Sequence, residues 1–82
     1  MTNTELLEEK IAKSGLKKSY IAKSIGLSPY GLTLKINNAN EFKASEIEKL
    51  CILLRIDDLE ERSAIFFASK VDSKSTARKE LL

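Results

Sequence analysis

The stretch KKSYIAKSIGLSPYGLTLKINN, residues 17–38, contains two short helical patterns separated by a glycine. Its first half predicts a helix over 17–25, because apolar residues recur there at the spacing of one helix face. The expected inner face consists of Ile21, Ala22 and Ile25. Gly26 is expected to end this helix, since glycine adopts a positive φ without strain.

The second half of the stretch predicts a helix over 29–36. Ser28 supplies a side-chain oxygen for the N-cap, and Pro29 fits the first helical position, where its missing N–H leaves no hydrogen bond unmade. Leu27 is expected to drop into the core beneath the turn. Residues that tolerate turn and left-handed conformations mark the end of the helix, namely Asn37, Asn38 and Asn40.

Helical periodicity gives this second helix an inner and an outer face. Leu32 and Ile36 fall together on the core side, so Tyr30 and Leu34 point outward with Thr33 at the flank. Two short helices joined by a turn with glycine are typical of a helix-turn-helix, whose second helix enters the major groove of DNA. In that position Leu34 suits contact with thymine methyl groups, and Tyr30 suits contact with a base edge or a phosphate. Thr33 suits both kinds of contact.

Charges are distributed unevenly along the 82 residues, although the net charge is only +2. From Lys10 to Lys43 the chain has seven lysines and one acidic residue, a local net charge of +6. From Ala44 to Ser69 it has three basic and six acidic residues, a local net charge of −3. One face of the folded chain is therefore expected to meet a polyanion.

Lysines that border the two short helices are expected to contact phosphates, which supply the nonspecific part of DNA affinity. The full set of candidate phosphate contacts is Lys17, Lys18, Ser28, Lys35, Asn37, Asn38 and Lys43. Ser28 is first a helix cap, and the two roles are compatible because a helix start also attracts phosphate. Lys10, Lys13 and Lys23 fit ordinary solvated charges equally well.

Three further helices are expected around this pair. The first opens the chain, with capping-box spacing from Thr2 to Glu5 and Gly15 at its end. Its apolar stripe consists of Leu6, Leu7 and Ile11.

The next helix follows capping-box spacing from Ser45 to Glu48. One face carries Ile47, Leu50, Cys51 and Leu54, and the apolar surface is widened by Ile52, Leu53 and Ile56. It is therefore expected to be the most buried helix.

A fifth helix is expected after the capping residues Asp57 and Asp58. Its apolar residues are Leu59, Ile65 and Phe66. The segment 64–68 fits either the end of this helix or a short strand. The predicted domain covers residues 1–68, and residues 69–82 form a polar C-terminal tail that is expected to be loosely ordered after Val71.

Composition argues against catalysis and metal binding. The chain has no histidine and a single cysteine, Cys51, so the usual general base and a zinc site built from cysteine and histidine are both excluded. The acidic pairs at 57–58 and 60–61 are better explained as charges at a helix start than as a paired-carboxylate site. We expect no enzyme activity, no cofactor and no small-molecule ligand.

No apolar run approaches the roughly 20 residues that a membrane span needs, and no signal-like stretch opens the chain. An intracellular, soluble protein without a membrane partner is expected.

Residues 15–38 resemble the helix-turn-helix of the lambda-repressor-like, Xre-type regulators. The positions that match the family pattern are Leu16, Ala22, Gly26, Leu27, Ser28 and Asn37. The segments LKINN, EFKASEIEKLCILL and IFFA that follow resemble small phage-encoded Cro-like repressors, and the likeness covers roughly Leu6 to Phe67. Lys18 stands where the family usually has glutamine, and Pro29 with Gly31 replace polar residues that read bases.

The resemblance implies an all-α fold, a compact five-helix lambda-repressor-like DNA-binding domain. It further implies a sequence-specific transcriptional regulator of phage or prophage type, which occupies an operator in the cytoplasm of a bacterial host and is nucleoid-associated when bound. It assigns Lys17 and Lys18 to the DNA backbone. The positions that it assigns to base readout are Pro29, Tyr30, Thr33 and Leu34.

Two copies on a two-fold site would add the base contacts of one short helix, so a weak or DNA-assisted homodimer is expected. Phe66 and Phe67 are adjacent, so a helix or strand cannot bury both on one face. Both are candidate dimer contacts, with one expected in the core and the other against a partner chain. The alternative is a protein-interaction module of the same fold, antitoxin-like or antirepressor-like, in which Tyr30 and Leu34 meet a protein.

Overall fold

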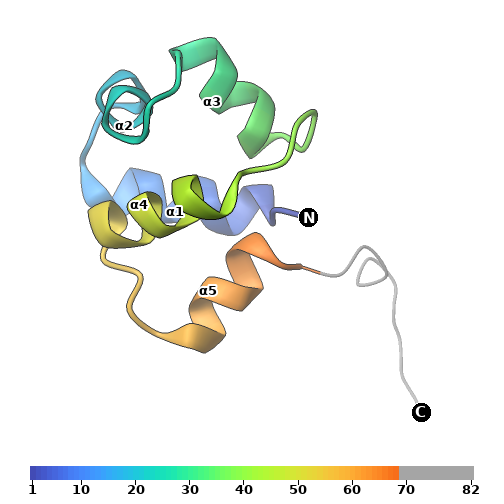
Figure 1. Ribbon diagram of the computed structural model, residues 1–82. Coiled ribbons are helices and arrows are strands. Elements are labelled where there is room, and N and C mark those ends of the chain that lie inside the picture. Colours follow the sequence, from blue (N-terminus) through green and yellow to red (C-terminus); the bar gives the residue numbers. More distant parts are fainter. Residues whose placement is uncertain (69–82) are drawn as a thin grey trace.

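A computed structural model describes residues 1–68, which form five helices and no strand (Figure 1). The helices are α1 (Thr4–Ser14), α2 (Lys18–Ile25), α3 (Pro29–Ile36), α4 (Ala44–Leu54) and α5 (Leu59–Phe66). The all-α, five-helix prediction is confirmed for this part of the chain. Residues 64–66 complete α5, Phe67 is its C-cap, and no strand forms in the segment 64–68; the predicted tail over 69–82 lies outside the described residues.

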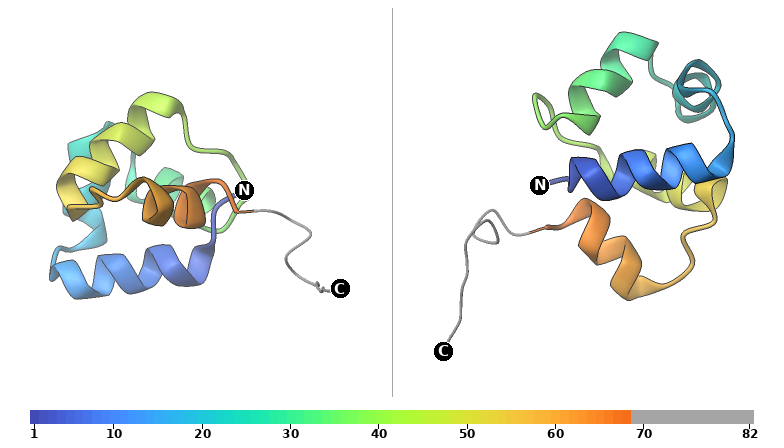
Figure 2. Two further views of the ribbon diagram at one scale, coloured as in Figure 1. Left: turned by 90° about the horizontal axis from the view of Figure 1, so that it is seen from below. Right: turned by 180° about the vertical axis from the view of Figure 1, so that it is seen from behind.

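The helices α2 and α3 lie together at one end of the molecule, and α5 lies at the other, with α1 and α4 between them (Figures 1 and 2). α1 contacts α3, α4 and α5, and α2 contacts α3 and α4. Every helix supplies at least one fully buried side chain to a single core, whose largest such members are Leu7, Ile21, Leu32, Ile36, Leu50 and Ile65. The core therefore fixes α3 relative to the rest of the fold. Among residues 1–68, no helix combines the length and apolar character needed to cross a membrane.

The turn between α2 and α3 forms as its local sequence predicts. Gly26 caps α2 with φ of 85°, and Leu27 is half-buried against the core. The side chain of Ser28 accepts a hydrogen bond from the backbone N–H of Gly31 at 3.0 Å, and Pro29 occupies the first turn of α3. The inner faces are those expected, with Ile21, Ala22 and Ile25 of α2 and Leu32 and Ile36 of α3 all buried.

Both predicted capping boxes were assigned to the wrong residues. Asn3, not Thr2, caps α1, because its side chain accepts a hydrogen bond from the N–H of Leu6 at 3.1 Å. α4 begins two residues earlier than Ser45 and Glu48 suggest, with Lys43 at the N-cap. There the carboxylate of Glu46 accepts a hydrogen bond from the backbone N–H of Lys43 at 2.9 Å.

The inner face of α4 is buried as predicted, but the apolar surface around it is narrower. Ile52 is 74% exposed, and Leu59 at the start of α5 is 75% exposed. Leu6 on α1 is also exposed, while Leu7 and Ile11 are buried. Asp58 stands at the N-cap of α5, although its side chain makes no capping hydrogen bond. Helical spacing alone overestimated how many of these side chains the core covers.

The N-terminal residues form hydrogen bonds both with the end of α3 and with the end of α5. The N–H of Asn3 donates to the carbonyl of Ile65 at 2.6 Å, and the N–H of Ala68 donates to the carbonyl of Met1 at 2.9 Å. The hydroxyl of Thr4 donates to the carbonyl of Ile36 at 2.6 Å. The chain start thus lies between the end of α3 and the end of α5 (Figures 1 and 2).

Substitution of Gly26 tests whether the turn depends on its backbone conformation. Apart from Gly26 and its two neighbours in the chain, no atom lies within 4 Å of a Cβ added at this position, so Gly26→Ala introduces only the strain of a positive φ. We expect a loss of about 1–2 kcal/mol in the free energy of unfolding, measured by chemical denaturation. Gly26→Asn is the matched control, because asparagine tolerates this conformation, and it should lose less. Equal losses for the two variants would show that φ is not the constraint.

Candidate nucleic-acid interface

The outer face of α3 carries three exposed side chains, of which periodicity predicted Tyr30 to point away from the core and Thr33 to lie at the flank. Tyr30 is 72% exposed, and Pro29 and Thr33 are also exposed. Leu32 and Ile36, on the opposite face of the helix, are each 1% exposed. Because the exposed set lies over the first turn and a half of α3, it forms one continuous surface next to the turn that joins α2.

Leu34 and Thr33 offer less to a ligand than the sequence suggested. Leu34 is half-buried, so it presents only part of its side chain outward. The hydroxyl of Thr33 donates to the carbonyl of Pro29 at 3.1 Å, which leaves its methyl group and its acceptor lone pairs available. Of the four predicted base-reading residues, Tyr30 is therefore the most prominent.

Ser28 retains a donor after capping α3. Its oxygen accepts the hydrogen bond from Gly31, so the hydroxyl hydrogen remains available to an external acceptor. It stands at the N-terminus of an eight-residue helix that begins with proline and has no acidic residue in its first turn. The positive end of the helix dipole adds to this preference for an anion.

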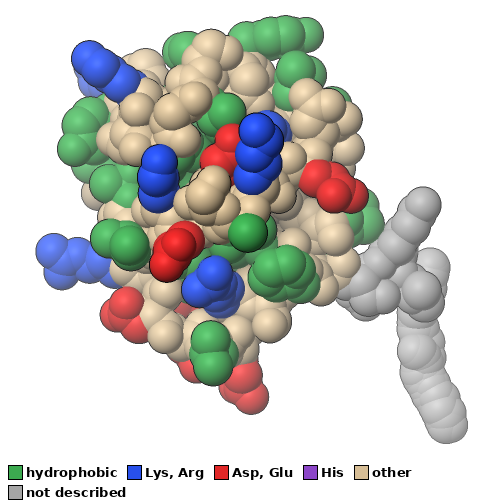
Figure 3. Space-filling model, viewed as in Figure 1, with side chains coloured by type: hydrophobic (Ala, Val, Ile, Leu, Met, Phe, Trp, Pro, Cys, Tyr) green, Lys and Arg blue, Asp and Glu red, His purple; other side chains and the backbone are tan. Residues whose placement is uncertain are grey.

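The segment that forms α2 and α3 is free of acidic residues. None occurs in the sequence between Glu9 and Glu41, a stretch that contains six lysines. In the space-filling view, hydrophobic groups and one basic group lie at the outer edge of the end formed by α2 and α3, basic and acidic groups are intermingled below them, and further acidic groups lie at the α5 end (Figure 3). The lysines behind the local charge of +6 are divided among several elements: Lys17, Lys18 and Lys23 belong to α2 or its N-cap, Lys35 to α3, Lys10 and Lys13 to α1, and Lys43 to the N-cap of α4. The end of the molecule formed by α2 and α3 therefore carries only part of that charge.

Four predicted phosphate contacts keep accessible groups. Lys17 at the N-cap of α2 is exposed, and so are Asn37 at the end of α3 and Lys43 before α4. No ion pair within residues 1–68 holds the ammonium group of Lys17 or Lys43. The ammonium group of Lys18 lies 2.8 Å from the carboxylate of Glu8, but both side chains are more than a third exposed. Exposed pairs of this kind are worth about 0–1 kcal/mol, so Lys18 can exchange partners at little cost.

Lys35, by contrast, is held within the fold. Its ammonium group lies 2.6 Å from the carboxylate of Glu46 on α4, and the two side chains are 12% and 9% exposed. The predicted phosphate contact at Lys35 is therefore corrected to a structural ion pair between α3 and α4, because the side chain is directed inward.

The same carboxylate holds the start of α4. Burial alone raises the pKa of Glu46, but hydrogen bonds from Lys35 and from the backbone N–H of Lys43, with the charges of both lysines, lower it below its usual value overall. Glu46 consequently stays ionised in the folded state while it joins the end of α3 to the start of α4.

Asn38 also has a structural partner in place of a phosphate. Its φ of 67° lies in the left-handed region, which asparagine tolerates. Its side-chain oxygen accepts from the N–H of Thr2 at 2.8 Å, and its side-chain amide donates to the carbonyl of Thr2 at 2.9 Å. Because both the oxygen and the nitrogen of the side-chain amide are engaged, the predicted phosphate contact at Asn38 is replaced by two hydrogen bonds to the backbone of Thr2.

The two candidate dimer residues at the end of α5 differ sharply in exposure. Phe66 is 4% exposed and packs edge-to-face on Phe42, with ring centroids 5.8 Å apart, so it belongs to the core and is removed from the dimer prediction. Phe67 is 61% exposed and borders a shallow hollow of about 120 Å³ together with Met1. The expected division between one buried and one outward phenylalanine is confirmed.

Glu46 is the site-supporting residue that the sequence did not predict. The spacing from Lys43 to Glu46 is that of a capping box, but lysine cannot supply the side-chain acceptor that makes such a box recognisable. The buried partner of Glu46 on α3 is distant in sequence, and so no local pattern identifies the pair.

Other chemistry is sparse in the described part of the chain. No group of three or more metal-binding side chains occurs among residues 1–68. Cys51 is buried, and burial raises the pKa of its thiol, so the thiolate form is disfavoured.

Comparisons of the chain with protein-family models, with curated proteins and with solved structures give no match.

Replacement of Glu46 tests the ion pair that holds α3. Glu46→Gln should lower the free energy of unfolding at pH 7 by about 1.5–3 kcal/mol, since hydrogen bonds to a buried charged group are lost. Because the folded-state pKa of Glu46 is depressed, its contribution is present above about pH 4.5 and is lost as the pH falls through the folded-state pKa. Thermal unfolding from pH 7 to pH 3 should therefore show a smaller acid-dependent loss in Glu46→Gln than in the wild type. Glu48→Gln, on the exposed side of α4, is the control; a Glu48→Gln profile that matches Glu46→Gln would contradict the assignment.

Proposed function

We propose that this protein is a sequence-specific DNA-binding transcriptional regulator of the phage or prophage repressor type. In this proposal α2, the turn at Gly26 and α3 act as a helix-turn-helix, and α3 enters the major groove of an operator. The observation that carries the proposal is the exposed face of α3 around Tyr30, which lies on a part of the chain with six lysines and no acidic residue.

The outer face of α3 supports base readout. Tyr30 and Thr33 offer an aromatic ring with a hydroxyl, a methyl group and acceptor lone pairs, which suit thymine methyl groups and base-edge donors. Pro29 and the exposed part of Leu34 add apolar contact. A face with few polar readers is expected to discriminate modestly for each half-site, at about 1–3 kcal/mol for each good contact.

Phosphate contacts are proposed for the accessible groups that remain after Lys35 and Asn38 are assigned to the fold. The set consists of Lys17, Lys18, Ser28, Asn37 and Lys43. Two of them, Lys17 and Ser28, are N-cap residues of α2 and α3, where backbone N–H groups add to the attraction for phosphate. These contacts position α3 without specifying sequence.

A homodimer formed through Phe67 completes the proposal. An exposed phenylalanine beside an exposed methionine, at the end of the last described helix, is an apolar surface that a second copy could cover. Two copies on a two-fold operator would read half-sites about one helical turn of DNA apart.

Selection of bound duplexes from a random DNA pool tests the function directly. The wild type should enrich a two-fold sequence. The double variant Tyr30→Ala with Thr33→Ala should still bind duplex DNA but should not enrich that sequence. A wild-type protein that binds no duplex at low salt, but captures a protein partner through Tyr30, would instead favour the protein-interaction module.

The electrostatic assignment has its own test. Lys17→Ala with Lys18→Ala should weaken binding to all duplexes and reduce the slope of log affinity against log salt by about 0.9 for each phosphate that is no longer neutralised. Lys49→Ala, an exposed lysine on α4, is the single-charge control. An unchanged slope in the double variant would contradict the placement of DNA against the start of α2.

Phe67→Ser tests the dimer by sedimentation across micromolar concentrations. Self-association should weaken in this variant and persist in Ile52→Ser, which removes an apolar side chain of comparable exposure from α4. A wild type that stays monomeric both free and on its operator would remove the dimer from the proposal.

A further inference from the structure

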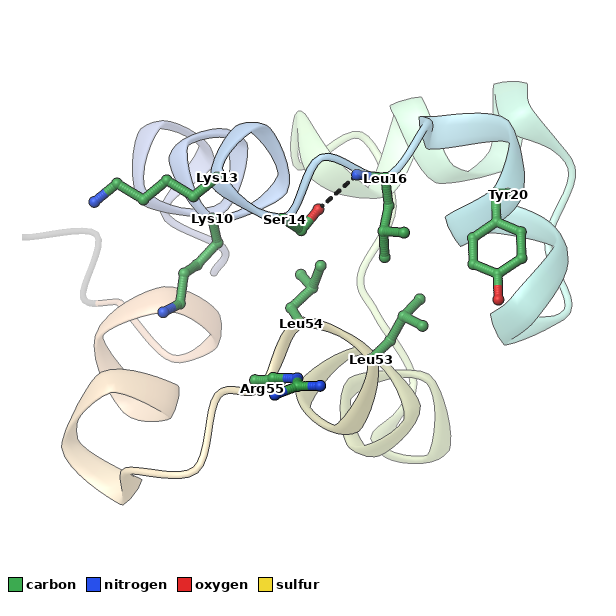
Figure 4. Close-up of a pocket in the computed structure, with 8 residues that line it drawn as sticks. All are labelled: Lys10, Lys13, Ser14, Leu16, Tyr20, Leu53, Leu54 and Arg55. Atoms are coloured by element: carbon green, nitrogen blue, oxygen red, sulfur yellow. Dashed lines mark hydrogen bonds between the residues drawn. The ribbon is translucent and has the colours of Figure 1, made fainter.

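A hollow of about 530 Å³ lies on a different part of the molecule from the outer face of α3. The end of α1, the start of α2 and the end of α4 surround it (Figure 4). Its apolar lining is formed by Leu16, Leu53 and Leu54. The volume falls within the range of small-molecule sites, which is about 300–1,000 Å³.

Arg55 borders this hollow in a backbone conformation that arginine rarely adopts. It caps the end of α4 with φ of 59°, a position where helices usually place glycine. A left-handed conformation for a residue with a side chain is unfavourable, and such residues cluster at functional sites. The strain thus coincides with a cation at the edge of a cavity.

The guanidinium of Arg55 has no ionic partner within residues 1–68, unlike the other two cations at the hollow. Lys10 lies 2.9 Å from Glu61, and Lys13 lies 3.2 Å from Glu9. Arg55 is therefore the cation at the hollow that can pair with an incoming anion without breaking an ion pair within residues 1–68.

Two polar groups remain for ligand binding once the internal hydrogen bonds are counted. Ser14 is engaged, because its hydroxyl donates to the carbonyl of Ile11 at 2.6 Å and accepts from the N–H of Leu16 at 3.0 Å. Tyr20 is 54% exposed, and its phenol makes no hydrogen bond to residues 1–68. Figure 4 shows Arg55 and Tyr20 on either side of Leu53, so the available polar groups flank the apolar lining.

We propose that this hollow binds a small organic carboxylate with an apolar body. The guanidinium of Arg55 pairs with the carboxylate, the geometry for which arginine is suited, and the leucines cover the apolar body. The phenol of Tyr20 donates a further hydrogen bond or packs along the ligand. An inorganic anion would leave the leucines uncovered, and a neutral apolar molecule would leave the guanidinium unpaired. Such a ligand runs against the expectation from the sequence that no small molecule is bound.

Titration of the full-length protein with 4-phenylbutyrate tests the site, with amide NMR shifts and calorimetry as readouts. Shifts should concentrate at Leu16, Tyr20 and 53–55. The uncharged analogue 4-phenylbutanol and inorganic phosphate should each bind at least about tenfold more weakly, because each lacks one of the two complementary parts. Equal binding by either analogue would overturn the proposal. So would the absence of shifts at these residues with phenylbutyrate at about 10 mM, since that concentration exceeds a dissociation constant of about 1 mM, the weakest that the proposal allows.

Two variants of Arg55 separate binding from folding. Arg55→Asn keeps a residue that tolerates the left-handed conformation, and it should weaken phenylbutyrate binding about tenfold or more. Arg55→Gly should raise the unfolding temperature by relieving strain while it also loses binding. Lys49→Gln removes one positive charge from the same helix outside the hollow and should bind as the wild type does. Retained affinity in both Arg55 variants would contradict the role of the guanidinium.

Discussion

The ion pair between Lys35 and Glu46 is the contact on which the placement of α3 depends most. α3 is eight residues long and has two fully buried side chains, Leu32 and Ile36, so apolar packing alone gives it only a small area of contact with the core. Glu46 joins the last turn of α3 to the first turn of α4, with both side chains almost wholly shielded from water. Such a pair is favourable only while both partners are present, because either charge alone would be buried without compensation.

The opposite end of α3 is held by the turn from α2, and the loop after it by Asn38 on the chain start. With both ends fixed, the exposed residues of α3 keep a defined orientation relative to the lysines at the start of α2. Pre-organisation of this kind matters for a short recognition helix, since each side chain that must be ordered on binding reduces affinity. Polar contacts inside the fold thus determine how the outer face is presented.

Local sequence was sufficient for the part of the structure that the proposed function uses. Gly26, Ser28 and Pro29 each act within a few residues, so the bounds of α3 and its buried face follow from spacing alone, although spacing did not predict that Leu34 is half-buried. Lys35 and Asn38 could not be assigned this way, since their partners are 11 and 36 residues distant in the chain. A lysine beside a predicted interface looks the same in sequence whether it faces DNA or a buried glutamate.

Surface apolar residues were the other source of error, for a related reason. Ile52 and Leu59 fit the helical stripe but lie beyond the area that neighbouring helices cover, which depends on how the helices cross. The sequence did not predict a role for Arg55, because its unusual φ at a helix end is visible only in the folded chain. Composition and periodicity therefore predicted the candidate interface, whereas long-range pairing decided which of its residues remain available.

Chemical-shift mapping of the isotope-labelled protein on a duplex selected from the random pool tests the central claim most directly. The account predicts that the largest amide shifts fall at 17–19, at 28–34 and at Asn37, with small changes in α5 away from Phe67. Shifts concentrated on α1 and α5, with α3 unaffected at saturation, would contradict it.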